Sequence, residues 1–143
     1  MMRLTLFTVS MPLALAFITP IANAQPLLEM CRPNQPNTSD KTCIVDGDTL
    51  WLNGENLRLE GFDTPEPQTE ICGGDFEREL AAQASARLVE LLNTNTWTVE
   101  RSGTDRYGRT LATIRIGGRD VGEWLVEERL ARWWPDGEEW WCG

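Results

Sequence analysis

The chain has 143 residues, with 22 Asp and Glu against 13 Lys and Arg, and it contains no histidine. This length predicts one domain, because domains usually have roughly 100–200 residues. Without histidine the chain cannot use a Ser-His-Asp or Cys-His nucleophile, a His-ligated zinc ion or an imidazole base. The net charge of −9 argues against binding of nucleic acid by bulk attraction, which normally needs a basic face.

The first 24 residues have the pattern of a secretory signal peptide. Arg3 precedes the mostly apolar stretch Leu4–Ile18, and Ala22-Asn23-Ala24 is a small-x-small cleavage signature. The alternative is an uncleaved membrane anchor, but the stretch is interrupted by polar residues and is shorter than the ~20 apolar residues that a span needs. Cleavage before Gln25 removes one basic and no acidic residue, so the net charge changes from −9 to −10. We expect a soluble product, secreted or periplasmic, that is not held in a membrane after cleavage.

The four cysteines point to two disulfides. Their even number favours disulfides in an exported protein, whereas a four-thiolate zinc site normally contains C-x2-C pairs, which this chain lacks. The sequence leaves three pairings open. We prefer Cys31–Cys43, which would tie an N-terminal arm to the first strand, together with Cys72–Cys142, which would tie the last residues to a mid-chain loop.

The mature chain is expected to begin with an arm and a three-strand meander. Gln25–Lys41 is rich in Pro, Asn and Ser and has no apolar periodicity, which predicts an arm held by its cysteine. Three strand patterns follow, at Thr42–Val45, Thr49–Leu52 and Asn56–Phe62. Asn53-Gly54 is a hairpin signal between the last two, and Leu57 and Leu59 should face the same side.

The second half of the chain combines helical and strand patterns. Asp75–Leu92 has apolar residues at helical spacing and acidic residues in its first turn, which predicts an amphipathic helix. Trp97–Glu100 and Thr110–Ile116 alternate as strands, and a second helix is expected from Asp120 to about Trp133. The order β-β-β-α-β-β-α predicts an α+β domain, mainly β, over residues 42–143, built as a five-stranded Greek-key barrel of the OB type.

Three motifs, around Asp48, Asp63 and Arg109, carry the candidate chemistry, although each alone is more often a turn or a strand end. They occur in a fixed order, with Arg58 five residues before the second motif. Together they resemble the thermonuclease, or staphylococcal nuclease-like, family over about Thr42–Trp133. The matching segments are VDGDT at Val45–Thr49, RL…DTPE within Arg58–Glu66, DRYGR at Asp105–Arg109 and LVEERLA at Leu125–Ala131.

The resemblance implies a Ca²⁺-dependent phosphodiesterase. Phosphodiester hydrolysis without histidine needs a hard cation, a carboxylate that orients or deprotonates water, and fixed positive charges around the phosphorus. Asp48 and Asp63 are oxygen ligands suited to Ca²⁺, and the resemblance adds the backbone carbonyl of Thr64 as a further ligand. Glu66 is implied as the general base, with a role that includes positioning of water.

The resemblance also implies roles for basic and aromatic side chains. Arg58 and Arg109 match the two catalytic arginines of the family, whose planar guanidinium groups grip phosphate through paired hydrogen bonds. Tyr107 would donate its hydroxyl to a bound phosphate, and Arg106 stands where the family often has a phosphate-binding lysine. The alternative for these arginines is ordinary ion pairing. We expect only that for Arg32, Arg101, Arg115, Arg119, Arg129 and Arg132.

Two features depart from the family pattern. The best-known members have a third helix and a basic surface, whereas this chain is acidic and no third helix is predicted. Five of the seven tryptophans fall between Trp124 and Trp141. They have the chemistry to stack on bases, but we favour packing over the core, because burial is the commoner use of aromatic side chains.

The expected function is that of a secreted, Ca²⁺-dependent nuclease, acting as a monomer on DNA and RNA with little sequence preference. The rival is a non-catalytic or very slow OB-fold module that binds nucleic acid or a protein partner. All five residues matched to the catalytic and ligand carboxylate and arginine positions are present, which favours the enzyme: Asp48, Arg58, Asp63, Glu66 and Arg109. The acidic net charge keeps the rival open.

Overall fold

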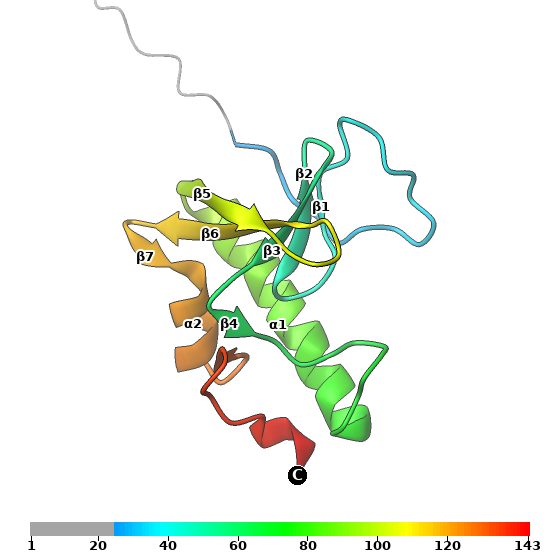
Figure 1. Cartoon of the computed structure of the whole chain (residues 1–143), viewed down its shortest axis with the longest axis vertical. Coiled ribbons are helices and arrows are strands. Elements are labelled where there is room, and N and C mark those ends of the chain that lie inside the picture. Colours follow the sequence, from blue (N-terminus) through cyan, green and yellow to red (C-terminus); the bar gives the residue numbers. More distant parts are fainter. Residues whose placement is uncertain (1–24) are drawn as a thin grey trace, which may run out of the picture.

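The computed structural model describes residues 25–143, so the predicted signal peptide at residues 1–24 lies outside the described part. Its elements are β1 (Cys43–Ile44), β2 (Thr49–Leu52), β3 (Glu55–Leu59), β4 (Phe62–Asp63), α1 (Gly74–Thr94), β5 (Trp97–Thr104), β6 (Thr110–Ile116), β7 (Arg119–Asp120), α2 (Val121–Glu127), β8 (Arg132–Trp133) and the 3₁₀ helix η1 (Trp140–Cys142). They form an α+β domain with a mixed sheet and two α-helices (Figure 1). Neither helix is long and apolar enough to cross a membrane.

The main sheet contains strands at the predicted positions and adds short ones. Its strand order is β1-β2-β3-β6-β5, with β7 paired to β6. Neighbours are antiparallel except β3 and β6, where Leu57 lies opposite Thr110 in a parallel register. In residues 25–143 this ladder is open, with β1 and β5 at its edges, so closure into an OB-type barrel stays a prediction.

The third predicted strand, Asn56–Phe62, is divided in two. Strand β3 ends at Leu59, and the chain turns at Gly61, which has a φ of 85°. The separate strand β4 then pairs antiparallel with β8, so that Asp63 lies opposite Arg132. This pairing brings the end of the chain to a candidate site residue.

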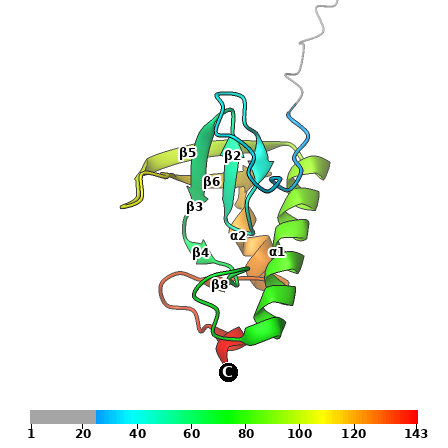
Figure 2. The same cartoon turned by 90° about the vertical axis from the view of Figure 1, so that its right-hand side faces the viewer.

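The hydrophobic core lies between the sheet and α1. Leu57 and Leu59 share the buried face as predicted, with 0% and 1% of their surface exposed. Helix α1 buries Leu88 in the same cluster, and its other buried positions recur at helical spacing. Figure 2 shows α1 beside the sheet along much of the molecule, with the chain end at η1 close to the first turn of the helix.

The predicted end of the second helix near Trp133 is wrong, because α2 ends at Glu127. Arg129 has a φ of 59°, and the N–H groups of Arg129 and Leu130 donate to carbonyl groups of the last turn. This is a Schellman motif, which satisfies carbonyls that the helix leaves unpaired. An arginine occupies the position where glycine is usual, so no sequence signal marks the stop.

Both preferred disulfides are present, Cys31–Cys43 and Cys72–Cys142. The N-terminal arm is also fixed by non-covalent contacts. Leu28 is 1% exposed, and the side-chain amide of Asn93 on α1 bonds both its N–H and its carbonyl at 2.8 Å. The arm therefore packs as part of the domain.

The prediction that the C-terminal tryptophans cover the core is confirmed for Trp141, which is 4% exposed. It is wrong for Trp133 and Trp134, which are 44% and 57% exposed. After α2, the described chain forms only β8 and η1, so it contains no third α-helix up to Gly143.

Candidate active site

Asp48 is buried in the turn between β1 and β2. It is 4% exposed, and its Oδ2 accepts hydrogen bonds from the backbone N–H of Thr64 at 3.2 Å and from the Thr64 hydroxyl at 3.1 Å. Gly47 permits this approach, because a Cβ there would lie 2.7 Å from the methyl carbon of Thr64. The first motif therefore docks directly on the second.

Arg58 joins the two aspartates that the resemblance implies as metal ligands. It lies on β3, opposite Thr49 of β2. Its guanidinium forms an ion pair with Oδ1 of Asp48 and a second, of 3.0 Å, with Oδ1 of Asp63. A planar guanidinium holds its partners in a fixed geometry, so the two carboxylates are kept close together on one side of the sheet.

Arg132 completes this charge network, although the sequence predicted only ordinary ion pairing for it and did not place it at the site. Its Nε and Nη2 atoms donate to Oδ2 of Asp63 at 3.2 and 3.1 Å, and its Nη2 also lies 2.5 Å from the carboxylate of Glu139. The Arg132 side chain is only 9% exposed. Both oxygens of Asp63 are thus bound by arginines, one from β3 and one from β8. The only sequence clue is the LVEERLA segment just before Arg132, and it does not indicate the partner.

Glu66 lies beside this network with its side chain half-buried. Burial, followed by the nearby carboxylates of Asp46 and Asp63, raises the pKa of Glu66 to about 7, although Arg58 opposes the shift. A carboxylate with a near-neutral pKa is suited to proton exchange with water. Asp46, to which the sequence assigned no role, therefore contributes to the electrostatics of the site.

The turn between β5 and β6 supplies the third motif. Asp105 organises it, because its carboxylate accepts hydrogen bonds from the backbone N–H groups of Tyr107 and Arg109 and pairs with Nε of Arg109 at 2.7 Å. Tyr107 is 67% exposed, and Arg106 donates a hydrogen bond of 2.6 Å to its hydroxyl oxygen. The turn thus presents two guanidinium groups and a phenol at the edge of the sheet.

The three motifs meet at one open cleft of about 1040 Å³. Seven of the eight predicted catalytic, substrate and metal residues line it: Arg58, Asp63, Thr64, Glu66, Arg106, Tyr107 and Arg109. The eighth, Asp48, lies beneath the lining, bonded to Thr64 and Arg58. The cleft is also lined by residues to which the sequence assigned no catalytic, substrate-binding or metal-binding role: Glu60, Glu70, Asp105, Arg132, Trp134 and Glu139.

Comparison with known proteins agrees with this constellation. The family model described as "Staphylococcal nuclease homologue" matches residues 56–138. The chain belongs to the staphylococcal nuclease homologue family. The resemblance drawn from the motifs is thereby confirmed.

The chain is also similar to several curated proteins. The chain is 36% identical over 91 residues to the succinoglycan biosynthesis protein ExoI of Rhizobium meliloti, covering 59% of this chain and 46% of the relative. It is 33% identical over 101 residues to a thermonuclease of Staphylococcus hyicus, with 62% and 54% covered. It is 35% identical over 95 residues to the SPbeta prophage-derived endonuclease YokF of Bacillus subtilis, with 62% and 31% covered. The matches span about half or less of each relative's length.

The donor set of this family member fits a hard cation. The carboxylates of Asp48 and Asp63 and the carbonyl of Thr64 are oxygen ligands of the kind that Ca²⁺ takes. The raised pKa of Glu66 comes first from burial and then from the nearby carboxylates of Asp46 and Asp63, whose negative charge a divalent cation would neutralise. Because both Asp63 oxygens are paired with arginines, a cation at Asp63 would have to share or displace one of these ion pairs.

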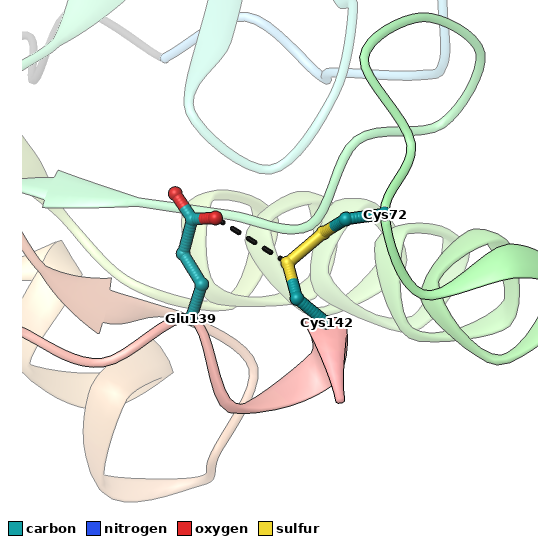
Figure 3. Close-up of side chains that lie close together, drawn as sticks. All are labelled: Cys72, Glu139 and Cys142. Carbon is teal, nitrogen blue, oxygen red and sulfur yellow. Dashed lines mark hydrogen bonds between the residues drawn. A yellow bond between two sulfur atoms is a disulfide. The ribbon is translucent and has the colours of Figure 1, made fainter.

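A second group with metal-ligand chemistry lies near the C-terminus. One side-chain atom each of Cys72, Glu139 and Cys142 lie within 4.8 Å of one another. The two sulfur atoms are joined in a disulfide, with the Glu139 carboxylate beside Cys142 (Figure 3). Disulfide sulfur is not the thiolate that binds zinc, so this group holds the chain end and is not a metal centre.

Proposed function

We propose that the protein is a nuclease that hydrolyses phosphodiester bonds of DNA and RNA with Ca²⁺ and with little sequence preference. The single observation that supports this most strongly is the meeting of Arg58, Asp63, Glu66 and Arg109 at one cleft, with Asp48 bonded beneath it. These residues come from three separate motifs, and together they offer oxygen ligands for a cation, a carboxylate base and two guanidinium groups at one cleft.

In this mechanism Asp48, Asp63 and the Thr64 carbonyl would hold a Ca²⁺ ion, which when bound would supply Lewis-acid polarisation of the phosphate. Glu66 accepts a hydrogen bond from the attacking water and takes up its proton as the new P–O bond forms. The bond from phosphorus to the leaving sugar oxygen breaks, and this oxygen takes a proton from solvent water. Arg58 and Arg109 donate to the phosphate oxygens, where negative charge grows in the transition state. Tyr107 and Arg106 bind a phosphate at the cleft edge.

We further propose that the protein is exported, to the periplasm or outside the cell, and that it acts as a monomer. We also propose that its sheet closes into an OB-type barrel. Export is supported by the signal-like sequence and by the two disulfides, which persist in oxidising compartments. The barrel is supported by the family match, since the strand order itself leaves the ladder open.

A second candidate function is a non-catalytic module that binds nucleic acid or a protein partner. It is favoured by the acidic cleft lining, which includes Glu60, Glu70 and Glu139. Such carboxylates repel phosphate and weaken capture of a polyanion, so they favour the protein-binding form of this alternative.

An assay on fluorogenic single-stranded DNA and RNA separates the two candidates. The mature oxidised protein should cut both with Ca²⁺ and neither with a chelator. Glu66→Gln and Arg109→Ala should each lower kcat by roughly 100-fold or more, the usual scale for one electrostatic stabiliser. The matched control is Arg101→Ala, because Arg101 is exposed and pairs with Glu55 outside the cleft. Wild-type turnover in both cleft variants would refute the roles proposed for Glu66 and Arg109, and no turnover in the wild type would favour the binding module.

A further inference from the structure

Glu77 is a buried carboxylate that the proposed mechanism does not use. It lies in the first turn of α1, where acidic residues are common because they favour the positive end of the helix dipole. Most such residues are exposed, as Asp75 is in this helix. Glu77 is 1% exposed, so its place at the helix start does not by itself account for its burial.

The partners of Glu77 lie at both ends of the loop that carries Glu66. Oε2 accepts hydrogen bonds of 2.7 Å from the backbone N–H groups of Cys72 and Gly73, which close the helix start. Oε1 accepts a hydrogen bond of 3.0 Å from the backbone N–H of Glu66, eleven residues away. Although burial alone raises the pKa of a carboxyl, these backbone hydrogen bonds hold the pKa of Glu77 below its ordinary value. Both oxygens are therefore acceptors at neutral pH.

The prolines on either side of Glu66 make the hydrogen bond from its N–H to Glu77 more important. Glu66 lies between Pro65 and Pro67, and proline has no N–H group. The N–H of Glu66 is thus the only main-chain donor in this three-residue segment, and Glu77 accepts it. The following proline also restricts Glu66 to extended backbone conformations. With its backbone stiff and anchored at one point, the Glu66 side chain has a defined starting position at the cleft.

We infer that Glu77 is a positioning residue, whose carboxylate fixes the backbone of Glu66 and thereby aims the Glu66 carboxylate at the reacting water. This inference rests on the proposed function of Glu66. Glu77 is among the residues at the same cleft, but both its carboxylate oxygens accept hydrogen bonds from backbone N–H groups, so it acts through Glu66. Because small misplacements of a catalytic group reduce rates strongly, its loss should affect turnover more than substrate binding.

The test variant is Glu77→Gln, which keeps the shape and replaces one acceptor oxygen by an NH₂ group. We expect kcat to fall by about tenfold or more while KM changes less than about threefold. The control is Asp75→Asn, which removes the same charge from the same helical turn at an exposed side chain paired with Arg78. It should leave both constants unchanged. A second control, Ile114→Val in the core, should lower the Tm without lowering kcat at a temperature well below it.

A double-mutant cycle with Glu66→Gln separates positioning from general destabilisation. If Glu77 acts through Glu66, the effect of Glu77→Gln on kcat should vanish in the Glu66→Gln background. Equal loss in both backgrounds would overturn the inference, as would wild-type kcat in Glu77→Gln. If Glu66→Gln alone keeps wild-type kcat, the proposed function of Glu66 fails instead, and with it the catalytic part of this inference.

Amide hydrogen exchange gives a readout that needs no activity and no variant. In the wild-type protein the Glu66 N–H should exchange far more slowly than those of the exposed residues Gln68 and Thr69 in the same loop. Fast exchange at Glu66 would overturn the anchoring even if the enzyme is active. Slow exchange in a protein without nuclease activity would leave the anchor standing and refute only the proposed function.

Discussion

Arg132→Met tests whether Arg132 holds Asp63, a proposed Ca²⁺ ligand, in place and thereby lowers the affinity for Ca²⁺. Methionine keeps the apolar stem and removes the guanidinium, which binds Asp63 Oδ2, Glu139 and the carbonyl of Gly137. Hydrogen bonds to charged groups contribute about 1.5–3 kcal/mol each at buried sites. We discount the contact with Glu139 because that side chain is 46% exposed. Asp63 also keeps its ion pair with Arg58. The expected loss is about 2 kcal/mol in the free energy of unfolding, or roughly 6–10 °C in Tm for a domain of this size.

The same change should strengthen Ca²⁺ binding, so stability and affinity move in opposite directions. If Ca²⁺ bound to Asp63 at a distance of roughly 6 Å from the Arg132 guanidinium, the two cations would repel by about 1.4 kcal/mol even with the dielectric constant of water, which corresponds to about tenfold in affinity. Calorimetric titration of Ca²⁺ into the chelator-treated protein measures the affinity, and urea unfolding without Ca²⁺ measures the stability. Arg101→Met is the control, because it removes the same charge from an ion pair outside the cleft. Weaker Ca²⁺ binding in the Arg132 variant, or unchanged stability, would refute the competition of Arg132 and Ca²⁺ for Asp63.

The pKa of Glu66, the charges of the cleft and the two disulfides each predict a measurable behaviour. The pKa of Glu66 in the folded protein without metal is raised to about 7. Its protonated form therefore stabilises the folded state below the ordinary carboxyl pKa, and this stabilisation is lost as pH rises through about 7. In urea unfolding with a chelator, Glu66→Gln should therefore be stabilised relative to the wild type at pH 8 but not at pH 4, and an equal difference at both would contradict the shift. The few cleft arginines among many carboxylates predict that kcat/KM on single-stranded DNA changes little with NaCl, or rises slightly at low salt; a steep fall would indicate a basic groove. Mass spectrometry should find Cys31–Cys43 and Cys72–Cys142 with no free thiol, and after reduction hydrogen exchange should increase at residues 134–143 before it does in the sheet.

Local sequence patterns predicted the main elements and named most of the candidate residues that meet at the cleft. The helix predicted at Asp75–Leu92 is present as Gly74–Thr94, because apolar spacing over several turns is a strong signal. The motifs named seven residues that line one cleft. Turns that contain Asp and Gly at fixed spacing adopt a limited set of backbone conformations. The disulfide pairing was preferred from the sequence, but only the structure chose it among three possibilities.

The tertiary structure alone decided which charges meet. Helix α2 stops at a Schellman turn with Arg129 in place of glycine, and this early stop frees β8 to pair with β4 and place Arg132 opposite Asp63. Likewise, Glu77 has the sequence pattern of an ordinary helix-start acid, yet packing buries it against the backbone of Glu66. Helix and strand patterns depend on neighbours a few residues away, whereas these contacts join residues 69 and 11 positions apart. Such pairs are set by how whole elements pack, and a local sequence pattern contains no information on that packing.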